Sequence, residues 1–345
     1  MQQPIVIAGP CAAESREQLF QTAKGLTESL AAKGLSLNYF RAGVWKPRSK
    51  PGDFSGVGKD ALPWLQEIQQ LFGIPVCVEV NAPDQLDWCE QHDIKVCWIG
   101  ARTAVNPFDV QAIADAAKHR DFTFMVKNPM IPDLKLWIGN IERFLNAGIT
   151  RLMAVHRGCA DSNESVYRNN PSWETAIDLK VRYPHIPMLC DPSHIAGQRH
   201  YIAQLSQLAL DYGFDGLMIE SHYQPYAALS DTEQQLTPSD LAEILSKLRF
   251  KDAISSPAEH ELRKQRTLIH NIDTQISVLL SKRMEIVDLI AKIKAEHNLP
   301  LVQPGQWNKV VQTYRDNSLQ DIDYHDFIEN FLELLHQSSI KRQRK

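Results

Sequence analysis

The sequence predicts an α/β protein, a (β/α)8 TIM barrel followed by a separate all-α helical domain. Three observations lead to this prediction. Eight short apolar runs recur through residues 1–250, amphipathic stretches with helical spacing lie between them, and a long tract without glycine or proline follows. Eight strand–helix units are the number that closes such a barrel. The alternative is a doubly wound open sheet, which usually has fewer strands.

The eight apolar runs are nearly continuous, as is typical of strands that are buried on both faces. In chain order they are Ile5–Pro10, Leu37–Gly43, Ile74–Val80, Lys95–Ala101, Phe122–Asn128, Arg151–Arg157, Pro187–Ser193 and Gly216–His222. The clearest helical stretches between them are Arg16–Lys33, Ala61–Phe72, Pro107–His119, Leu134–Ala147 and His200–Tyr212.

Composition excludes several classes of protein. The chain has 345 residues, of which 43% are hydrophobic and 23% charged, as in ordinary globular proteins. A net charge of −4 argues against nucleic-acid binding by bulk electrostatics. No apolar run is long enough to cross a bilayer, and the N-terminus lacks the pattern of a signal peptide. Six cysteines without a CxxC pair indicate reduced thiols, so we expect a cytoplasmic protein.

The segment Asn38–Ser49, NYFRAGVWKPRS, predicts a strand that runs into a loop with three cations. Guanidinium groups clamp phosphates and carboxylates with paired hydrogen bonds, although a solvated basic loop has the same composition. In a barrel, all strands end at one mouth. The polar residues expected there are Cys11, Arg41, Lys46, Arg48, Glu79, Arg102, Lys127, Arg157, Asp191, His194, Glu220 and Asp231. Cations suit an anionic phosphate substrate, and the Cys, His and carboxylate set suits a borderline divalent metal.

Six motifs at these strand ends resemble those of 3-deoxy-D-arabino-heptulosonate 7-phosphate (DAHP) synthases, in the same order. They are GPCAAES from Gly9, RAGVWKPRS from Arg41, WIGAR from Trp98, HRG from His156, CDPSH from Cys190, and GLMIESH from Gly216 with ALSD further on. The resemblance covers residues 4–250. It is to the barrel class that also lies close to 3-deoxy-D-manno-octulosonate 8-phosphate (KDO8P) synthases.

The resemblance implies three groups of site residues. A divalent ion, Mn, Fe, Co or Zn, would be held by Cys11, His194, Glu220 and Asp231. Phosphoenolpyruvate would lie among Arg41, Lys46, Arg102, Lys127 and Arg157, with Lys46 also acting in catalysis. Erythrose 4-phosphate would meet Arg48 and Ser49.

The residue types agree with the implied condensation. The aldehyde oxygen must be polarised, which a divalent metal does as a Lewis acid, and the enol-ether carbon of phosphoenolpyruvate then attacks the aldehyde. Water adds to the cationic C2 that results, and phosphate leaves. A cluster of cations holds two anionic substrates that would otherwise repel each other. The KPRS loop separates the two families, since KDO8P synthases resemble KANRSS there. Three positions depart from the commoner pattern: Ser49 stands for threonine, Lys127–Pro129 for KRG, and His156 for glutamate.

The tract from Ala258 to Asn298 contains no glycine or proline, and its apolar residues recur at helical spacing. Such a helix is roughly 60 Å long at about 1.5 Å per residue, so its apolar stripe requires a partner, most simply a second copy. Arg283 and Lys294 are eleven residues apart and share a face. Arg266 lies about 100° away around the helix, so it suits a pocket of the partner chain.

These cations resemble the pattern of the all-helical chorismate mutases, over residues 259–345. The pattern Arg, Asp, Arg, Lys is present as Arg266, Asp273, Arg283 and Lys294, and the closing helix adds Ser339 and Gln343. Chorismate rearranges without proton transfer, so the site must pin two carboxylates and stabilise charge on the ether oxygen. The resemblance assigns the carboxylates to Arg266 (from the partner) and Arg283, and the ether oxygen to Lys294 and Gln343. By the same resemblance, Gln306 and Ser339 would be further substrate contacts, and Gln306–Trp307 replaces a common Arg–Glu pair.

We therefore expect a bifunctional enzyme of the shikimate pathway, at least a homodimer. The domains expected are a DAHP synthase barrel at 1–250, a linker at 251–258 and a chorismate mutase domain at 259–345. Its ligands would be phosphoenolpyruvate, erythrose 4-phosphate and chorismate, with no nucleic acid and no membrane. Two alternatives remain: a KDO8P synthase barrel, and a helical tail that only dimerises the chain and senses a ligand.

Overall fold

The computed structural model describes residues 4–46, 52–160, 166–249, 256–301, 304–316 and 322–344. In the last three helices some side chains lie outside this description, that of Gln306 among them. The residues separate into two compact units, Met1–Ala253 and Ile254–Lys345. None of the helices described is long and apolar enough to cross a membrane.

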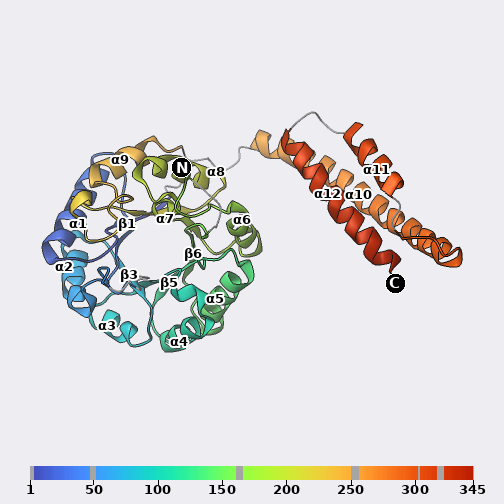
Figure 1. Cartoon of the computed structure of the whole chain (residues 1–345). Helices are drawn as coiled ribbons and strands as arrows, with labels where there is room; N and C mark the ends of the chain where they lie inside the picture. The colour runs from blue at the N-terminus through green and yellow to red at the C-terminus, as the bar shows by residue number, and fades with distance from the viewer. Residues whose placement is uncertain are drawn as a thin grey trace. The chain divides into compact units, whose positions relative to one another are not determined.

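The first unit is a closed barrel of parallel strands in sequence order, with the first strand paired to the last (Figure 1). The strands are β1 Ile5–Gly9, β2 Tyr39–Ala42, β3 Val76–Val80, β4 Val96–Ile99, β5 Thr123–Lys127, β6 Leu152–His156, β7 Met188–Cys190 and β8 Gly216–Glu220. Each predicted apolar run contains one of them. The predicted barrel is confirmed, and the open doubly wound sheet is wrong.

Helices surround the strands as an outer ring (Figure 1). They are α1 Arg16–Ala31, α2 Leu62–Phe72, α3 Gln85–Gln91, α4 Pro107–Ala117, α5 Leu134–Asn146, α6 Trp173–Arg182, α7 Pro192–Ala196, α8 Ile202–Asp211 and α9 Pro238–Lys247. Short 3-10 turns are η1 Gly58–Ala61, η2 Thr103–Val105, η3 Arg199–Tyr201 and η4 Pro225–Ala227. Side-chain caps begin several helices: Ser15 accepts from Gln18 N at α1, and Asp191 from His194 N at α7.

Alternate residues of each strand face two different cores. Val6 and Ala8 pack under the helices, while Ile7 packs inside the barrel with residues of other strands such as Met125 and Met218. Because both faces are buried, the strands carry apolar residues at almost every position, which is why the sequence shows runs rather than alternation. The polar residues are therefore confined to the strand ends.

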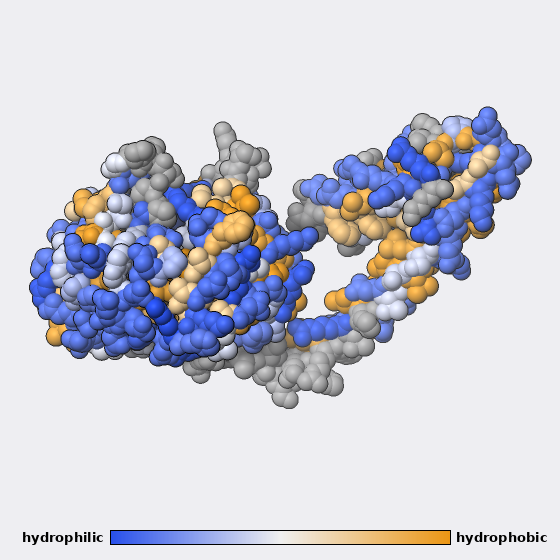
Figure 2. Space-filling view, turned by 90° about the horizontal axis from the view of Figure 1, so that it is seen from below, coloured by the Kyte–Doolittle hydropathy of each residue, from blue (hydrophilic) through white to orange (hydrophobic). Residues whose placement is uncertain are grey.

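Within its described residues, the second unit contains three helices, α10 Ser256–Glu296, α11 Pro304–Asp316 and α12 Ile322–Gln343. Val287 of α10 and Leu332 and Leu335 of α12 are buried, and α10 packs against α12. Other apolar side chains of α10 stay exposed, as the hydrophobic colouring along these helices in Figure 2 shows. They include Leu268, Ile269, Ile272, Val278, Leu279, Leu289 and Ile293.

Candidate active sites

A cavity of about 290 Å³ lies at the carboxyl ends of the barrel strands, where the sequence predicts the site. Most of its lining was expected: Arg41, Lys46, Glu79, Arg102, Lys127, Arg157, His194 and Asp231. A second cavity of about 560 Å³ shares Lys46 and Arg102 with the first. Arg48 and Ser49 lie outside the described residues.

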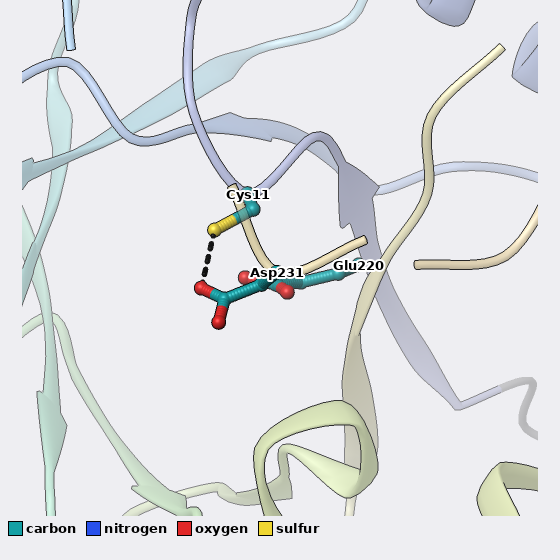
Figure 3. Close-up of side chains that lie close together, drawn as sticks. All are labelled: Cys11, Glu220 and Asp231. Carbon is teal, nitrogen blue, oxygen red and sulfur yellow. Dashed lines mark hydrogen bonds between the residues drawn. The ribbon is translucent and has the colours of Figure 1, made fainter. Parts of the chain in front are cut away.

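Three of the four expected metal ligands form a tight cluster (Figure 3). Cys11 follows β1, Glu220 ends β8, and Asp231 lies in the segment after β8, yet one ligand atom from each lies within 4.8 Å of the others. The thiol of Cys11 donates to Asp231 Oδ2 across 3.0 Å. His194, from α7, lies beside this group, with its Nε2 atom 3.7 Å from Glu220 Oε1.

The donor set of this cluster fits a divalent ion. Burial raises the pKa of the Cys11 thiol to about 12, and the charge of Glu220 adds to the rise. The ammonium of Lys46, 2.9 Å from the sulfur, opposes it. A divalent cation at this point would favour the thiolate and neutralise the carboxylates, and thiolate, imidazole and carboxylate together suit borderline transition metals.

Two buried ion pairs place cations beside the cluster. Arg41 is only 1% exposed and donates from Nη2 to Glu220 Oε1 at 3.0 Å. Its Nε and Nη1 atoms are buried, with no hydrogen-bond partner among the described residues. Lys127 donates to Asp191 Oδ2 at 2.5 Å. An anion in the cavity would supply the acceptor that the guanidinium of Arg41 needs.

The charge states of these groups follow from burial and their neighbours. Burial lowers the pKa of Lys127, although the Asp191 carboxylate counteracts it. Burial by itself would raise the pKa of Asp191, but His194 and Lys127 hold it well below its usual range. Burial also lowers the pKa of Arg157, to about 10. Arg157 therefore remains cationic at neutral pH, as a phosphate site requires.

Sequence reasoning missed several residues of the mouth. Arg168 and Asn169 lie in the β6–α6 connection and line the cavity, and Gln234 bonds to a metal-site carboxylate. Arg157 Nη1 donates to Asn169 Oδ1 at 2.8 Å. Trp98 lines the cavity wall under Arg41, whose Cζ atom lies 5.0 Å from the ring centroid. The connection residues stand far from any strand end in sequence, so no local signal marks them.

A second group of predicted residues meets between α10 and α12. Arg283 Nη1 donates to Ser339 Oγ at 2.8 Å. Lys294 Nζ donates to Gln343 Oε1 at 3.1 Å and to the carbonyl of Leu301 at 2.6 Å. Lys294 and Ser339 are both buried. The structure thus pairs the four predicted mutase residues in two contacts within one chain, each joining α10 to α12.

Arg266 does not join this group in its own chain. It is exposed, and it lies 17 residues before Arg283 on the same helix, roughly 26 Å along the axis at about 1.5 Å per residue. Trp307 stacks on His336, with ring centroids 4.0 Å apart. The side chain of Gln306 lies outside the described residues.

Family models match nearly the whole chain. Residues 1–254 match the DAHP synthetase I family, and residues 265–344 match chorismate mutase type II. The chain is similar to phospho-2-dehydro-3-deoxyheptonate aldolase of Thermotoga maritima, with 30% identity over 71% of this chain and 68% of that protein.

Two further comparisons concern the barrel. The crystal structure of the DAHP synthase from Thermotoga maritima has a TM-score of 0.62 at 29% identity and covers 70% of this chain and 68% of that one. A 2-dehydro-3-deoxyphosphooctonate aldolase of Aromatoleum aromaticum is 26% identical over 72% of this chain and 91% of that protein.

Proposed function

The chain belongs to the DAHP synthetase I family and also contains a chorismate mutase type II domain. We therefore propose that it catalyses two steps of aromatic amino acid biosynthesis. The barrel condenses phosphoenolpyruvate with erythrose 4-phosphate to give DAHP and phosphate. The helical unit rearranges chorismate to prephenate. The observation that carries the first activity is a cavity in which buried cations adjoin a Cys, Glu and Asp cluster.

Phosphoenolpyruvate is proposed to bind among the cations of the first cavity, Arg41, Lys46, Arg102, Lys127 and Arg157. Arg41 and Lys127 already neutralise Glu220 and Asp191, so each brings a fixed orientation to the substrate rather than a freely moving charge. The unsatisfied nitrogens of Arg41 are available to a carboxylate or phosphate oxygen. Lys46 sits between the metal cluster and both cavities, which suits a role in catalysis as well as in binding.

The metal site is proposed to consist of Cys11, His194, Glu220 and Asp231. The supporting observations are the 4.8 Å cluster and the imidazole beside it. An ion such as Mn, Fe, Co or Zn would act there as a Lewis acid on the aldehyde oxygen. These four residues would hold the ion at the barrel mouth. Arg41 and Lys46, which contact Glu220 and Cys11, would keep the bound anion next to it.

Erythrose 4-phosphate is proposed as the aldehyde substrate, with Arg48 and Ser49 as its phosphate contacts. The second cavity, which shares Lys46 and Arg102 with the first, gives this second anion a place. Purified protein should be assayed in parallel with erythrose 4-phosphate and arabinose 5-phosphate, each with phosphoenolpyruvate and Mn²⁺. We expect phosphate release with the first aldehyde only. Turnover that prefers arabinose 5-phosphate would instead establish the KDO8P alternative.

The mutase site is proposed to combine two chains. Arg283 and Lys294 lie on one face of α10 and contact Ser339 and Gln343 of α12, respectively. Arg283 would hold one substrate carboxylate, with Ser339 and Gln306 as further contacts, and Lys294 and Gln343 would donate to the ether oxygen. Arg266 of the partner subunit would hold the other carboxylate, since it is exposed and distant from its own pocket.

A homodimer through α10 is part of the same proposal. The helix leaves a row of large apolar side chains exposed, which a second copy would cover. The alternative that the tail only dimerises and senses a ligand is favoured by Trp307, which stacks on His336 where a charged side chain is common in mutases. We place the enzyme in the cytoplasm, in keeping with six buried, unpaired cysteines.

A further inference from the structure

In each of the two carboxylates of the metal cluster, one oxygen accepts a hydrogen bond from a residue that is not an expected metal ligand. Asp231 Oδ1 accepts a hydrogen bond from Arg168 Nη1 at 2.8 Å, and Glu220 Oε2 accepts one from Gln234 Nε2 at 2.7 Å. The remaining oxygens face the centre of the group. Asp231 Oδ2 lies 3.0 Å from the sulfur of Cys11, and Glu220 Oε1 lies 3.7 Å from His194 Nε2 while also accepting from Arg41.

Gln234 and Arg168 act as one unit. The amide oxygen of Gln234 accepts from the same Nη1 atom of Arg168, at 2.9 Å, that donates to Asp231. This contact fixes which way the amide points, because its oxygen faces the guanidinium and its nitrogen must then face Glu220. Gln234 is buried and follows Asp231 by only three residues. The segment that carries the ligand Asp231 therefore also carries the residue that holds the ligand Glu220.

We propose that Gln234 and Arg168 are positioning residues that turn one oxygen of Glu220 and one of Asp231 away from the ion. Each carboxylate then offers a single oxygen. The inference rests on the metal site proposed above and extends it to the ions that the site admits.

The consequence concerns selectivity between ions. A carboxylate that is free to rotate can chelate with both oxygens, as calcium sites with six to eight oxygen ligands require. Two carboxylates restricted to one oxygen each, with a thiolate and an imidazole, supply four donors, which suits transition ions of low coordination number. Loss of the contacts from Gln234 and Arg168 should therefore weaken the binding of such ions and favour larger ions that prefer oxygen ligands.

The test uses the full chain, stripped of metal and titrated with Co²⁺ and separately with Ca²⁺. In the wild type, Co²⁺ should give a thiolate-to-metal absorption band and the strong visible bands of a low-coordinate ion. Gln234→Met removes the donor at nearly constant volume. We expect it to weaken Co²⁺ binding by about 10- to 100-fold, to reduce the intensity of the visible bands, and to narrow the ratio of Co²⁺ to Ca²⁺ affinity.

The matched control is Gln85→Met, which removes a buried amide that accepts from Asn81 N at 2.7 Å and touches neither carboxylate. It should leave the cobalt spectrum unchanged. Arg168→Met is the second variant, because Arg168 is 46% exposed and its loss removes the hydrogen bond to Asp231 Oδ1 without emptying the core. It should change the spectrum in the same direction.

The possible outcomes separate this inference from the proposed function. Wild-type spectra and affinities in both Gln234→Met and Arg168→Met would overturn the positioning role. If the wild type itself gives no thiolate band with Co²⁺, the metal site through Cys11 is wrong, and the inference falls with it. A thiolate band in the wild type supports the metal site. An altered spectrum in both variants, but not in Gln85→Met, then supports the positioning role as well.

Discussion

His156 is a buried histidine whose ring is surrounded by aromatic side chains. The rings of Trp137, Trp173 and Phe214 lie against it, and its Nε2 atom contacts the carbonyl oxygen of Pro171. Burial lowers its pKa to about 4, so the ring is neutral at pH 7 and donates to that carbonyl. Pro171 lies just past Arg168 and Asn169, and the contact therefore anchors the end of the connection that lines the cavity.

Replacing His156 should change how the stability of the barrel depends on pH. Its pKa is lowered from 6.5 to about 4 on folding, so between these values the unfolded chain binds one more proton than the folded chain. The contribution of His156 to the free energy of unfolding is fully present above about pH 6.5. It falls as the pH drops toward 4, by about 3 kcal/mol in total. His156→Phe should reduce the difference between the melting temperatures at pH 7 and pH 5.

His156→Gln separates titration from hydrogen bonding. The amide does not titrate but can donate to Pro171, so this variant should lose the same pH dependence while keeping its KM for phosphoenolpyruvate nearer to wild type than His156→Phe does. If both variants keep the wild-type difference in melting temperature between pH 7 and pH 5, the buried neutral histidine is not the source of that difference.

Cys11 is the residue on which the metal prediction is most easily checked. Cys11→Ala removes the sulfur that lies 3.0 Å from Asp231 Oδ2 and should abolish metal retention and the aldol activity. Only a small side chain is lost, so the barrel should remain folded. Metal content by mass spectrometry, circular dichroism and phosphate release are the measurements. Full phosphate release from a variant without bound metal would contradict the assignment.

Helix α10 is an element that cannot be stable in water by itself over its whole length. Ile272 and Leu279 lie seven residues apart on one side and are 55% and 64% exposed within a single chain. A second copy that covered them would remove this apolar surface from water, at about 25 cal/mol per Å². In the proposed dimer, this pairing would bring Arg266 of one chain toward Arg283 and Lys294 of the other.

Charges placed on this row should separate the subunits. Ile272→Asp combined with Leu279→Asp would bury unpaired carboxylates at the contact, which costs several kcal/mol, so sedimentation at micromolar concentration should show a smaller species. Ser281→Asp is the control, because it adds a charge at an exposed position nine residues after Ile272, on the opposite side of the same helix. An unchanged molar mass in the double variant, together with a folded far-ultraviolet spectrum, would exclude this surface as the dimer contact.

At the scale of the whole molecule, the mutase site should depend on two chains. Arg266→Ala and Lys294→Ala should each be nearly inactive as mutases, because each removes a charge contact from a desolvated site. After dissociation and mixing, about half of the dimers combine the two variants, and each of these has one intact site of two. About a quarter of the wild-type activity should return.

The two activities provide an internal control for that experiment. Phosphate release by the barrel should survive both substitutions, which shows that the chain is folded. If subunit exchange is verified and no prephenate forms, then Arg266 acts within its own chain or the helical unit is not a mutase. An inactive wild-type tail would favour the dimerising, ligand-sensing alternative.

The barrel could be predicted from the sequence, because eight strands buried on two faces must be apolar at nearly every position, and their ends must carry the polar residues. Helical spacing also indicated that Arg283 and Lys294 share a face, and the resemblance to the chorismate mutases added Ser339 and Gln343. Which residues meet across the mouth could be seen only in the folded chain. Arg168 and Gln234 lie in connections whose paths no periodic pattern records, and Cys11 reaches Asp231 only because the closed barrel returns β8 to β1 across more than two hundred residues of chain.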